Sequence, residues 1–330
     1  LSFHMFLLRL NMFLLRLNVL CCGRAAYFGT TFQFRTLFLV FLSYKENVVF
    51  FIQLAYNSII LCKFASRFFY YIIMKQKFIL DLKVVSVERL NEKNVLIKLT
   101  HDAELPAMKP GQFVEVRVDG SASTYLRRPI SINFVDKERS ELWLLVAEVG
   151  DGTRTIAAVK PGDTLNCVLP LGNGFTYPAS SSDSLLLIGG GVGVAPLLYF
   201  GMLCKERGIA VTFLLGARTA SDLLELEEFK KYGDVFVTTE DGSMGEKGYV
   251  TNHSILHERH FNQISTCGPK PMMVSVAKYA RTANIRCEAS LENLMACGVG
   301  ACLCCVEKTT EGNLCVCTEG PVFDVNQLLW

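Results

Sequence analysis

Six of the thirteen cysteines in this 330-residue sequence lie in one short stretch near its end. Three of them, Cys297, Cys302 and Cys305, are spaced C-x4-C-x2-C, and either Cys315 or Cys317 can supply a fourth thiolate. Four thiolates at this spacing are typical of a [2Fe–2S] site. Small residues inside the loop let its backbone come close to such a cluster: Gly298, Gly300 and Ala301.

Two other interpretations of these cysteines stay open. Cys302-x2-Cys305 with Cys315-x-Cys317 also offers four thiolates to zinc, although the x4-x2 loop is unusual for that metal. A disulfide cluster would imply export, which nothing else in the sequence suggests. The other seven cysteines are scattered, so the clustering favours metal chemistry in a reducing compartment, and we expect a cytoplasmic protein.

The length and charge of the chain limit its function class. A length of 330 residues suggests two or three domains. The net charge of +2 gives no support for nucleic-acid binding.

Residues 1–73 differ from the rest, because Phe, Leu, Tyr and Ile dominate and MFLLRLN occurs twice in tandem. The apolar runs fall below the usual membrane-spanning length, and no signal-peptide pattern is clean. One interpretation is a membrane anchor. The favoured one is a leader outside the functional fold, with Met74 as the natural start and membrane association not expected.

Residues 74–180 show short alternating strands separated by turns such as Lys109-Pro110-Gly111. We expect strands at 80–87, 95–99, 112–118, 130–134 and 141–146, which together predict a small antiparallel β-barrel. Two motifs lie on it. In Arg128-Pro129-Ile130-Ser131, the arginine can bind a diphosphate and the serine hydroxyl can meet the edge of a flavin ring. The alternative is that Arg128 is a solvated residue at the end of a strand. Gly150-Asp151-Gly152-Thr153 fits either a phosphate-binding turn at the start of a helix or an ordinary N-cap turn.

Residues 181–290 alternate strands and helices, which predicts a parallel α/β sheet. The strand 184–188 leads into a glycine turn with the spacing Gly191-x-Gly193-x-x-Pro196, and a helical pattern runs to residue 206. Strand, glycine turn and helix form the context of dinucleotide binding. Further strands are expected at 211–215, 235–239, 263–267 and 285–289, with helices at 222–231 and 271–281.

Two strand ends in this region carry candidate cofactor residues. Cys267-Gly268-Pro269 follows the strand 263–267, and its glycine turn would let a nicotinamide approach the backbone, whereas the thiol itself is better explained as structural. Glu240 and Asp241 follow another strand and would disfavour a 2′-phosphate, which favours NAD. Arg218 argues mildly for NADP.

Taken in order, these motifs resemble a ferredoxin–NADP reductase-type module, and more closely the family of electron-transfer subunits of dihydroorotate dehydrogenase B. The resemblance covers about residues 76–330. It is most specific in SLENLMACGVGACLCC, from Ser290 to Cys305, and in Cys317 before Gly320-Pro321-Val322-Phe323. It implies a flavin-binding β-barrel at 74–180, a Rossmann-like NAD-binding α/β domain at 181–290 and a [2Fe–2S] domain at 291–330.

The resemblance also implies cofactors and a partner. One FAD would contact Arg128 to Ser131, the segment Leu145, Val146 and Ala147, and Gly152 with Thr153. One [2Fe–2S] cluster would be held by Cys297, Cys302, Cys305 and Cys317. Electrons would pass from dihydroorotate through the FMN of a catalytic subunit, the cluster and FAD to NAD+, in pyrimidine biosynthesis. The assembly would be a heterotetramer of two subunits of each kind, and this subunit needs no acid/base catalytic residue.

Two alternatives accompany this interpretation. A related flavin/iron–sulfur reductase subunit serving ferredoxin, sulfur or hydrogenase chemistry shares every motif above. A zinc-stabilised binding module without redox activity would be colourless. One departure from the family pattern is Cys304, where a glycine is usual, and this spare thiol puts the choice of ligands in some doubt.

Overall fold

The computed structural model describes residues 76–330, so the predictions for residues 1–73 and for Met74 lie outside the described residues. Within 76–330, no helix is both long enough and apolar enough to cross a membrane.

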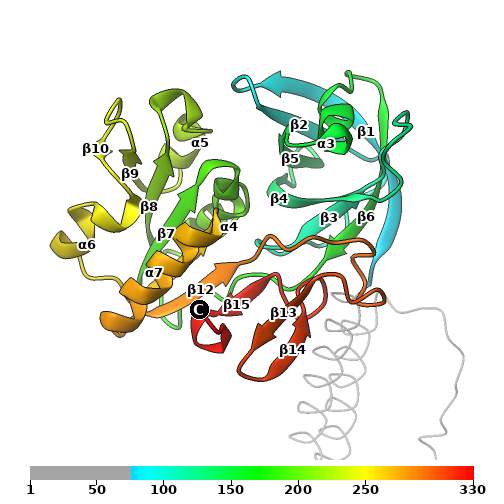
Figure 1. The fold of residues 1–330 in the computed structure, drawn as a ribbon. Coiled ribbons are helices and arrows are strands. Elements are labelled where there is room, and N and C mark those ends of the chain that lie inside the picture. The colour runs from blue at the N-terminus through cyan, green and yellow to red at the C-terminus, as the bar shows by residue number, and fades with distance from the viewer. Residues whose placement is uncertain (1–75) are drawn as a thin grey trace, which may run out of the picture. The chain divides into compact units, whose positions relative to one another are not determined.

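The first part of the described chain is a closed six-stranded antiparallel barrel, as predicted (Figure 1). Its strands pair in the order β1-β2-β5-β4-β3-β6, and α3 (Asp151–Ala157) packs beside β5. The barrel strands are β1 (Phe78–Arg89), β2 (Asn94–Thr100), β3 (Phe113–Val116), β4 (Arg128–Asp136), β5 (Glu141–Ala147) and β6 (Thr164–Leu171). The sequence analysis missed β6, in which Pro170 stands near the end, a residue that usually argues against a strand.

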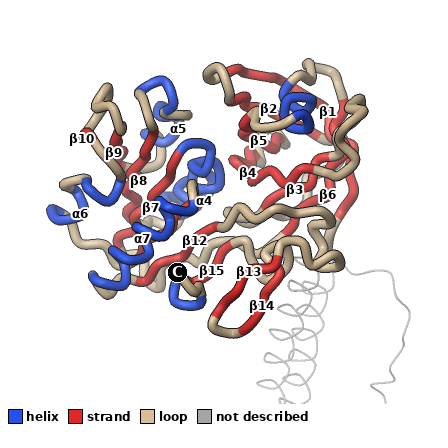
Figure 2. The backbone as a smooth tube through the Cα atoms, viewed as in Figure 1, coloured by secondary structure: helices blue, strands red, loops and turns tan. Residues whose placement is uncertain are grey.

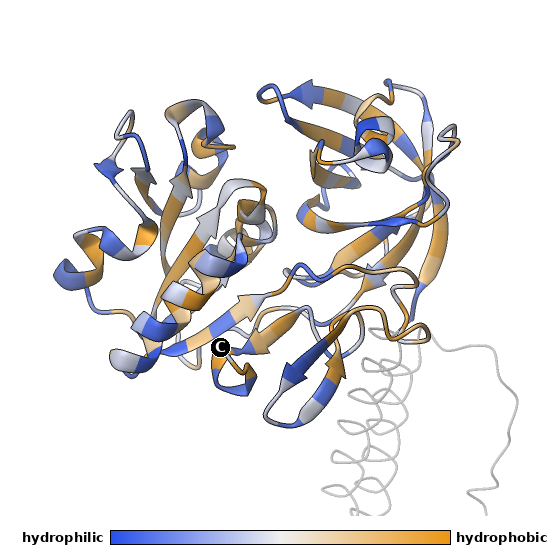
Figure 3. Cartoon of the chain, viewed as in Figure 1, coloured by the Kyte–Doolittle hydropathy of each residue, from blue (hydrophilic) through white to orange (hydrophobic). Residues whose placement is uncertain are grey.

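The second part is a sheet with the order β10-β9-β8-β7-β11-β12-β15, in which all pairs but the last are parallel. Its strands are β7 (Ser184–Gly190), β8 (Ala210–Ala217), β9 (Asp234–Thr239), β10 (Glu246–Lys247), β11 (Gln263–Cys267) and β12 (Arg286–Ser290). Strands β7 and β8 are hydrophobic along most of their length because both faces are covered, whereas β10 at the edge is hydrophilic (Figure 3).

The helices that cover this sheet are two long ones, α4 (Ala195–Glu206) and α7 (Lys270–Thr282), and two short ones, α5 (Leu226–Lys230) and α6 (Ile255–Glu258). They agree with the predictions at α4 and α7, whereas α5 differs in extent and α6 was not predicted. The predicted helix 222–231 was wrong in extent, because a 3-10 turn (Ala220–Asp222) is followed by Glu225 with φ of +54°. A left-handed residue interrupts helical geometry, so only five residues remain helical.

The last part of the chain joins both preceding parts. A hairpin of β13 (Val306–Thr309) and β14 (Gly312–Cys315) is followed by β15 (Val322–Asp324), which pairs antiparallel with β12 and so completes the sheet. Residues of this part share one hydrophobic core with Phe113 and Leu171 of the barrel: Cys305, Val316, Cys317 and Phe323. The domain boundaries at 180 and 290 stay predictions.

Candidate electron-transfer site

Two glycine turns meet at the carboxyl ends of neighbouring strands in the α/β sheet. Strands β7 and β11 pair in parallel with Gly189 opposite Cys267, so the turns that follow them lie side by side. A Cβ on Gly193 would lie 2.4 Å from the Cα of Gly268, which no side chain allows. The structure therefore brings together five predicted site residues: Gly191, Gly193, Cys267, Gly268 and Pro269.

The thiol of Cys267 is buried and held protonated. Its Sγ lies 3.9 Å from Oε1 of Glu292, and burial, reinforced by the Glu292 charge, raises the pKa of the thiol well above its usual value. Burial also raises the pKa of Glu292. A protonated thiol is a poor nucleophile, so the expected structural role of this cysteine agrees with its surroundings.

Glu292 is a residue that the sequence analysis missed. It follows β12, the strand next to β11, and lines a pocket of about 130 Å³ together with Gly268, Pro269 and Lys270. The signal was available, because the carboxyl ends of parallel strands meet at one edge of a sheet. A buried carboxyl beside the Gly268 turn is a candidate nicotinamide contact.

The adenosine end of the predicted nucleotide site lies at β8 and β9. The backbone N–H of Asp241 donates to the carbonyl of Arg218 at 3.2 Å, so the two residues that argued for different nucleotides are neighbours. The hydroxyl and backbone N–H of Ser243 donate to the Asp241 carboxylate at 2.6 and 2.9 Å, which lowers its pKa. An ionised carboxylate here disfavours a 2′-phosphate.

The candidate flavin motifs come together at one end of the barrel. Arg128, Pro129, Ile130 and Ser131 are the first four residues of β4, and Leu145, Val146 and Ala147 end the antiparallel neighbour β5. Gly152 touches Arg128, because a Cβ there would lie 2.7 Å from its Nε. Because Gly152 has no Cβ, the turn at the start of α3 can pack directly against the Arg128 side chain.

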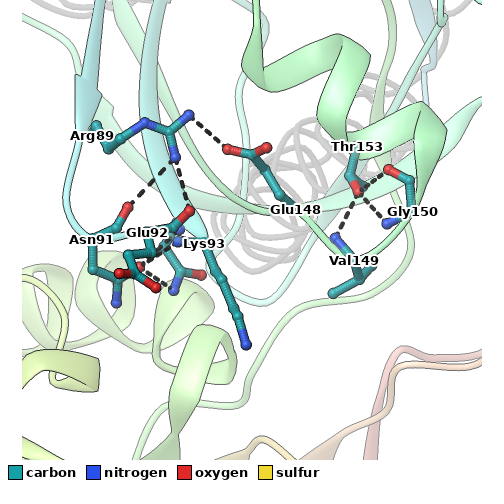
Figure 4. A network of polar contacts seen from close by, with 9 residues as sticks. Arg89, Asn91, Glu92, Lys93, Glu148, Val149, Gly150 and Thr153 are labelled. Atoms are coloured by element: carbon teal, nitrogen blue, oxygen red, sulfur yellow. Dashed lines mark hydrogen bonds and ion pairs between the residues drawn. The ribbon is translucent and has the colours of Figure 1, made fainter.

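The turn before α3 is held by a network of polar contacts (Figure 4). The Thr153 hydroxyl accepts from the backbone N–H groups of Val149 and Gly150 at 3.0 and 3.1 Å. Arg89 pairs with Glu148 at 2.7 Å. Two apolar side chains near this turn are exposed: Val149 at 83 % and Tyr125 at 91 %. Tyr125 follows Thr124, whose side chain lies close to Gly152. Sequence analysis did not single out these exposed apolar side chains.

The candidate cluster ligands lie on a segment, residues 291–305, that contains no helix or strand (Figure 2), and on the chain after β14. Cys305 and Cys317 are buried, Cys297 is partly buried and Cys302 is exposed, as is the spare Cys304. Backbone N–H groups point at three of the sulfurs. Val299 donates to Cys297 at 3.4 Å, Gly300 to Cys317 at 3.1 Å and Cys317 to Cys305 at 3.4 Å.

These contacts test whether the four cysteines fit an iron–sulfur cluster. Burial disfavours the Cys297 thiolate, but N–H groups of the loop outweigh it and lower the pKa of Cys297 to about 6. Peptide N–H groups aimed at thiolates are how proteins hold such clusters and tune their potentials. Cys317 is linked to Gly300 in the loop and to Cys305, whereas Cys315 is the last residue of β14. The chemistry of the donors therefore fits a cluster, although no three ligating side chains in residues 76–330 are gathered closely enough to hold a metal ion. Cys317 as the fourth ligand stays a prediction.

The cluster loop and the flavin motif are separated by a single strand. Gly298, with φ of +67°, packs against β3, where a Cβ would lie 2.8 Å from Cγ of Glu115. Glu115 is paired directly with Pro129 of the flavin motif on β4. Neighbouring strands are about 4.8 Å apart, so the cluster loop packs on a residue of the strand that is paired with the flavin motif.

Glu115 itself was also missed. It is 1 % exposed, and among the described residues neither carboxyl oxygen has a hydrogen-bond partner. Burial raises its pKa to about 7, which Arg127 opposes and Cys297 reinforces. The sequence signal was a charged residue inside the otherwise apolar strand Phe113-Val114-Glu115-Val116.

The fold and the site together define a class, the ferredoxin reductase-like oxidoreductases with a flavin barrel and a nucleotide sheet. A structure of NADH-dependent reduced ferredoxin–NADP oxidoreductase is similar, with a TM-score of 0.69, 30% identity and coverage of 76% of this chain and 90% of that one. A ferredoxin NADP+ reductase from Neisseria gonorrhoeae with bound FAD and NADP shares the fold, with a TM-score of 0.52, 17% identity and coverage of 62% and 91%.

Sequence comparisons identify the family within that class. Residues 187–278 match the oxidoreductase NAD-binding domain, and residues 292–329 match the iron–sulfur cluster binding domain of dihydroorotate dehydrogenase B. The dihydroorotate dehydrogenase B (NAD(+)) electron transfer subunits of Geobacillus kaustophilus and Listeria monocytogenes are 36% and 37% identical to this chain. Each alignment covers 75% of this chain, and 97% and 98% of those proteins. The chain belongs to this family of electron transfer subunits, which confirms the resemblance.

Proposed function

We propose that this chain passes electrons from dihydroorotate, oxidised on an FMN-containing catalytic subunit, to NAD+ in pyrimidine biosynthesis. Dihydroorotate gives up two electrons and two protons to become orotate, NAD+ takes two electrons and one proton, and one proton is released. The observation that carries the proposal is the contact of Gly298 with the side chain of Glu115, a residue of β3 that is paired with Pro129 of the flavin motif.

The residues present divide this work between three sites. When bound, FAD exchanges electrons in pairs with a nicotinamide and singly with the [2Fe–2S] cluster. Arg128 to Ser131, Leu145 to Ala147 and Gly152 with Thr153 would hold the FAD. The glycine turns at Gly193 and Gly268 would receive NAD+, and Cys297, Cys302, Cys305 and Cys317 would bind the cluster. The chain supplies placement and potential tuning rather than acid/base catalysis.

The surface around the cluster loop supports a partner that docks there. Three large apolar side chains of the ligand-bearing segment are exposed, Leu294 at 85 %, Val299 at 44 % and Leu303 at 64 %. Exposed apolar side chains gathered on one segment mark an interaction surface. We infer that the catalytic subunit covers this loop, in an assembly of two subunits of each kind, which mass measurement of the purified complex would test.

The test of the docking surface is Val299→Asp in the complex with the catalytic subunit. We expect dihydroorotate-driven NAD+ reduction to fall at least about tenfold, because a buried charge disrupts an apolar interface. NADH oxidation by an artificial acceptor should keep its rate, since that reaction needs only the flavin and nucleotide sites. The matched control is Val85→Asp on β1, where Val85 is 42 % exposed. Equal loss of both activities in Val299→Asp would contradict the docking surface.

The alternative of a reductase subunit serving ferredoxin has one observation in its favour, the similarity to the NADH-dependent reduced ferredoxin–NADP oxidoreductase at 30% identity. The identity to the dihydroorotate dehydrogenase subunits is higher and covers nearly their whole length. Purification from the native source separates the two, because our proposal requires an FMN-containing dihydroorotate-oxidising partner.

A further inference from the structure

Strand β4 continues beyond the flavin motif, and two of its consecutive residues, Asn133 and Phe134, contact side chains or backbone of the α/β sheet domain. The pairing of β4 with β5 shifts register between Ile132 and Phe134, which makes Asn133 the extra residue of a β-bulge. In a regular strand, neighbouring side chains point to opposite faces. The bulge instead lets Asn133 and Phe134 both reach the sheet domain, and bulges commonly re-aim side chains in this way.

Asn133 is fully buried and bridges the two halves of the candidate hydride-transfer site. Its Nδ2 donates to the backbone carbonyl of Ala195 at 3.3 Å and to Oε2 of Glu225 at 2.9 Å. Ala195 is the first residue of α4 and follows the glycine turn at Gly193, while Asn133 lies two residues after Ser131. One side chain therefore connects the flavin strand to the start of the nucleotide-binding helix.

The acceptor Glu225 is held in an unfavourable conformation. It is the N-cap of α5 with φ of +54°, which for a residue other than glycine persists only where the surroundings fix it. Its Oε1 and the Oδ1 of Asn133 are buried acceptors without a hydrogen-bond partner among the described residues. Such a costly arrangement is better explained by a requirement on geometry than by stability.

Further contacts between β4 and the sheet domain are aromatic and less directional. Phe134 meets Tyr199 of α4 and Tyr232 after α5, each with ring centroids 5.9 Å apart. Beside them lies a pocket of about 270 Å³, lined by Trp143 and Lys98 of the barrel and by Glu225. Apolar packing permits small sliding movements, whereas the Asn133 hydrogen bonds fix a register.

We propose that Asn133 and Glu225 are positioning residues that set the nicotinamide site against the flavin site and thereby the rate of hydride transfer. This inference rests on the proposed function. Hydride transfer requires the reacting atoms about 3–3.5 Å apart, and a misplacement of about 1 Å can lower a rate roughly a hundredfold.

The test measures flavin reduction by NADH in rapid-mixing experiments on the full chain loaded with FAD and cluster. Asn133→Leu keeps the volume but removes both hydrogen bonds, and we expect the limiting rate to fall about 10- to 100-fold with little change in the Kd of NADH. The limiting rate should also fall in Glu225→Ala, a substitution at a partly exposed position. Glu225→Gln keeps an acceptor and gains donors for the Asn133 Oδ1, so it should retain most of the rate.

The matched control is Asn91→Ala. Asn91 also bridges the barrel and the sheet domain, because its Nδ2 donates to the Ser221 carbonyl at 3.1 Å, but it lies at the surface. Its rate should not change. A second readout is independent of turnover. Hydrogen exchange in the first turn of α4 should accelerate in Asn133→Leu and not in Asn91→Ala.

The outcomes separate the inference from the proposed function. Suppose that NADH reduces the flavin of the wild type, and that it reduces the flavin of Asn133→Leu and Glu225→Ala at the same rate when both variants are fully loaded with FAD. The positioning role is then overturned. If NADH does not reduce the wild-type flavin at all, both ideas fail. Loss of rate in Glu225→Ala together with retention in Glu225→Gln supports the role, since a purely structural contribution would change the melting temperature without this pattern.

Discussion

The barrel makes two interfaces whose construction differs. At the cluster interface, the backbone of Gly298 packs on the side chains of Glu115 and Leu171, so closely that a Cβ at Gly298 would lie 2.8 Å from Cγ of Glu115. At the nucleotide interface, formed by Asn133 and Phe134 against Ala195, Tyr199 and Glu225, side chains fill the space and one amide supplies the register.

The difference matches what each interface must do. The cluster interface fixes a loop that carries metal ligands, and a glycine lets this loop approach the buried Glu115 and Leu171 side chains more closely than any other residue could. The nucleotide interface must let NAD+ enter and NADH leave, and packing between pairs of side chains permits the small movements that this requires. The stricter geometric demand of hydride transfer is then met by directional hydrogen bonds rather than by close packing.

The largest effect should come from the ligands of the cluster interface. Cys317→Ser should abolish the cluster, because the Cys317 sulfur is buried and accepts from the Gly300 N–H, while its backbone N–H donates to the Cys305 sulfur. Dihydroorotate-driven NAD+ reduction should drop more than about a hundredfold, while flavin reduction by NADH continues. Iron content and the visible spectrum are the measurements. Cys315→Ser is the control and should keep its iron, and iron loss in Cys315→Ser alone would reverse the ligand assignment.

A smaller effect is expected when only the backbone contact is disturbed. Gly298→Ala places a Cβ 2.8 Å from Glu115 and in left-handed backbone, whereas Gly208→Ala after α4, at the similar φ of +73°, meets nothing within 4 Å. Both variants bear the strain of a side chain on left-handed backbone. The difference between their free energies of unfolding therefore isolates the packing against Glu115. We expect Gly298→Ala to lose about 1–2 kcal/mol more free energy of unfolding. Denaturant titration of both proteins checks this, and equal losses would show that β3 yields to the loop.

An effect of similar size, but dependent on pH, is expected at the nucleotide interface. Burial raises the pKa of Glu225 from 4.5 to about 7; Asn133 and Lys98 oppose the shift, and Glu228 and Glu88 add to it. Because the folded state disfavours the charged form, this carboxyl contributes stability below pH 4.5 that is lost as pH rises through 7. Relative to wild type, Glu225→Gln should gain on the order of 2 kcal/mol between pH 5 and 8. Parallel stability curves for the two proteins would rule out ionisation of Glu225 in this range.

The sequence by itself determined the elements whose chemistry is local. The C-x4-C-x2-C spacing, the glycine turn after β7 and the Gly268 turn after β11 each lie within a few residues, so spacing alone specified them. The alternation of apolar residues predicted five of the six barrel strands, and the alternation of strands and helices predicted the parallel sheet. These features need only short-range geometry and the repeat of the backbone.

The tertiary structure decided what depends on distant segments. The position of Asn133 in a bulge follows from the register of β4 against β5, which no local pattern encodes. Glu115 becomes a residue between the flavin motif and the cluster loop only because Gly298, more than 180 residues later, packs on β3. Residue spacing left Cys315 and Cys317 equivalent, and they differ because folding buries Cys317 beside Gly300 and Cys305. Burial and long-range pairing are properties of the whole chain, and they set which of its reactive groups work together.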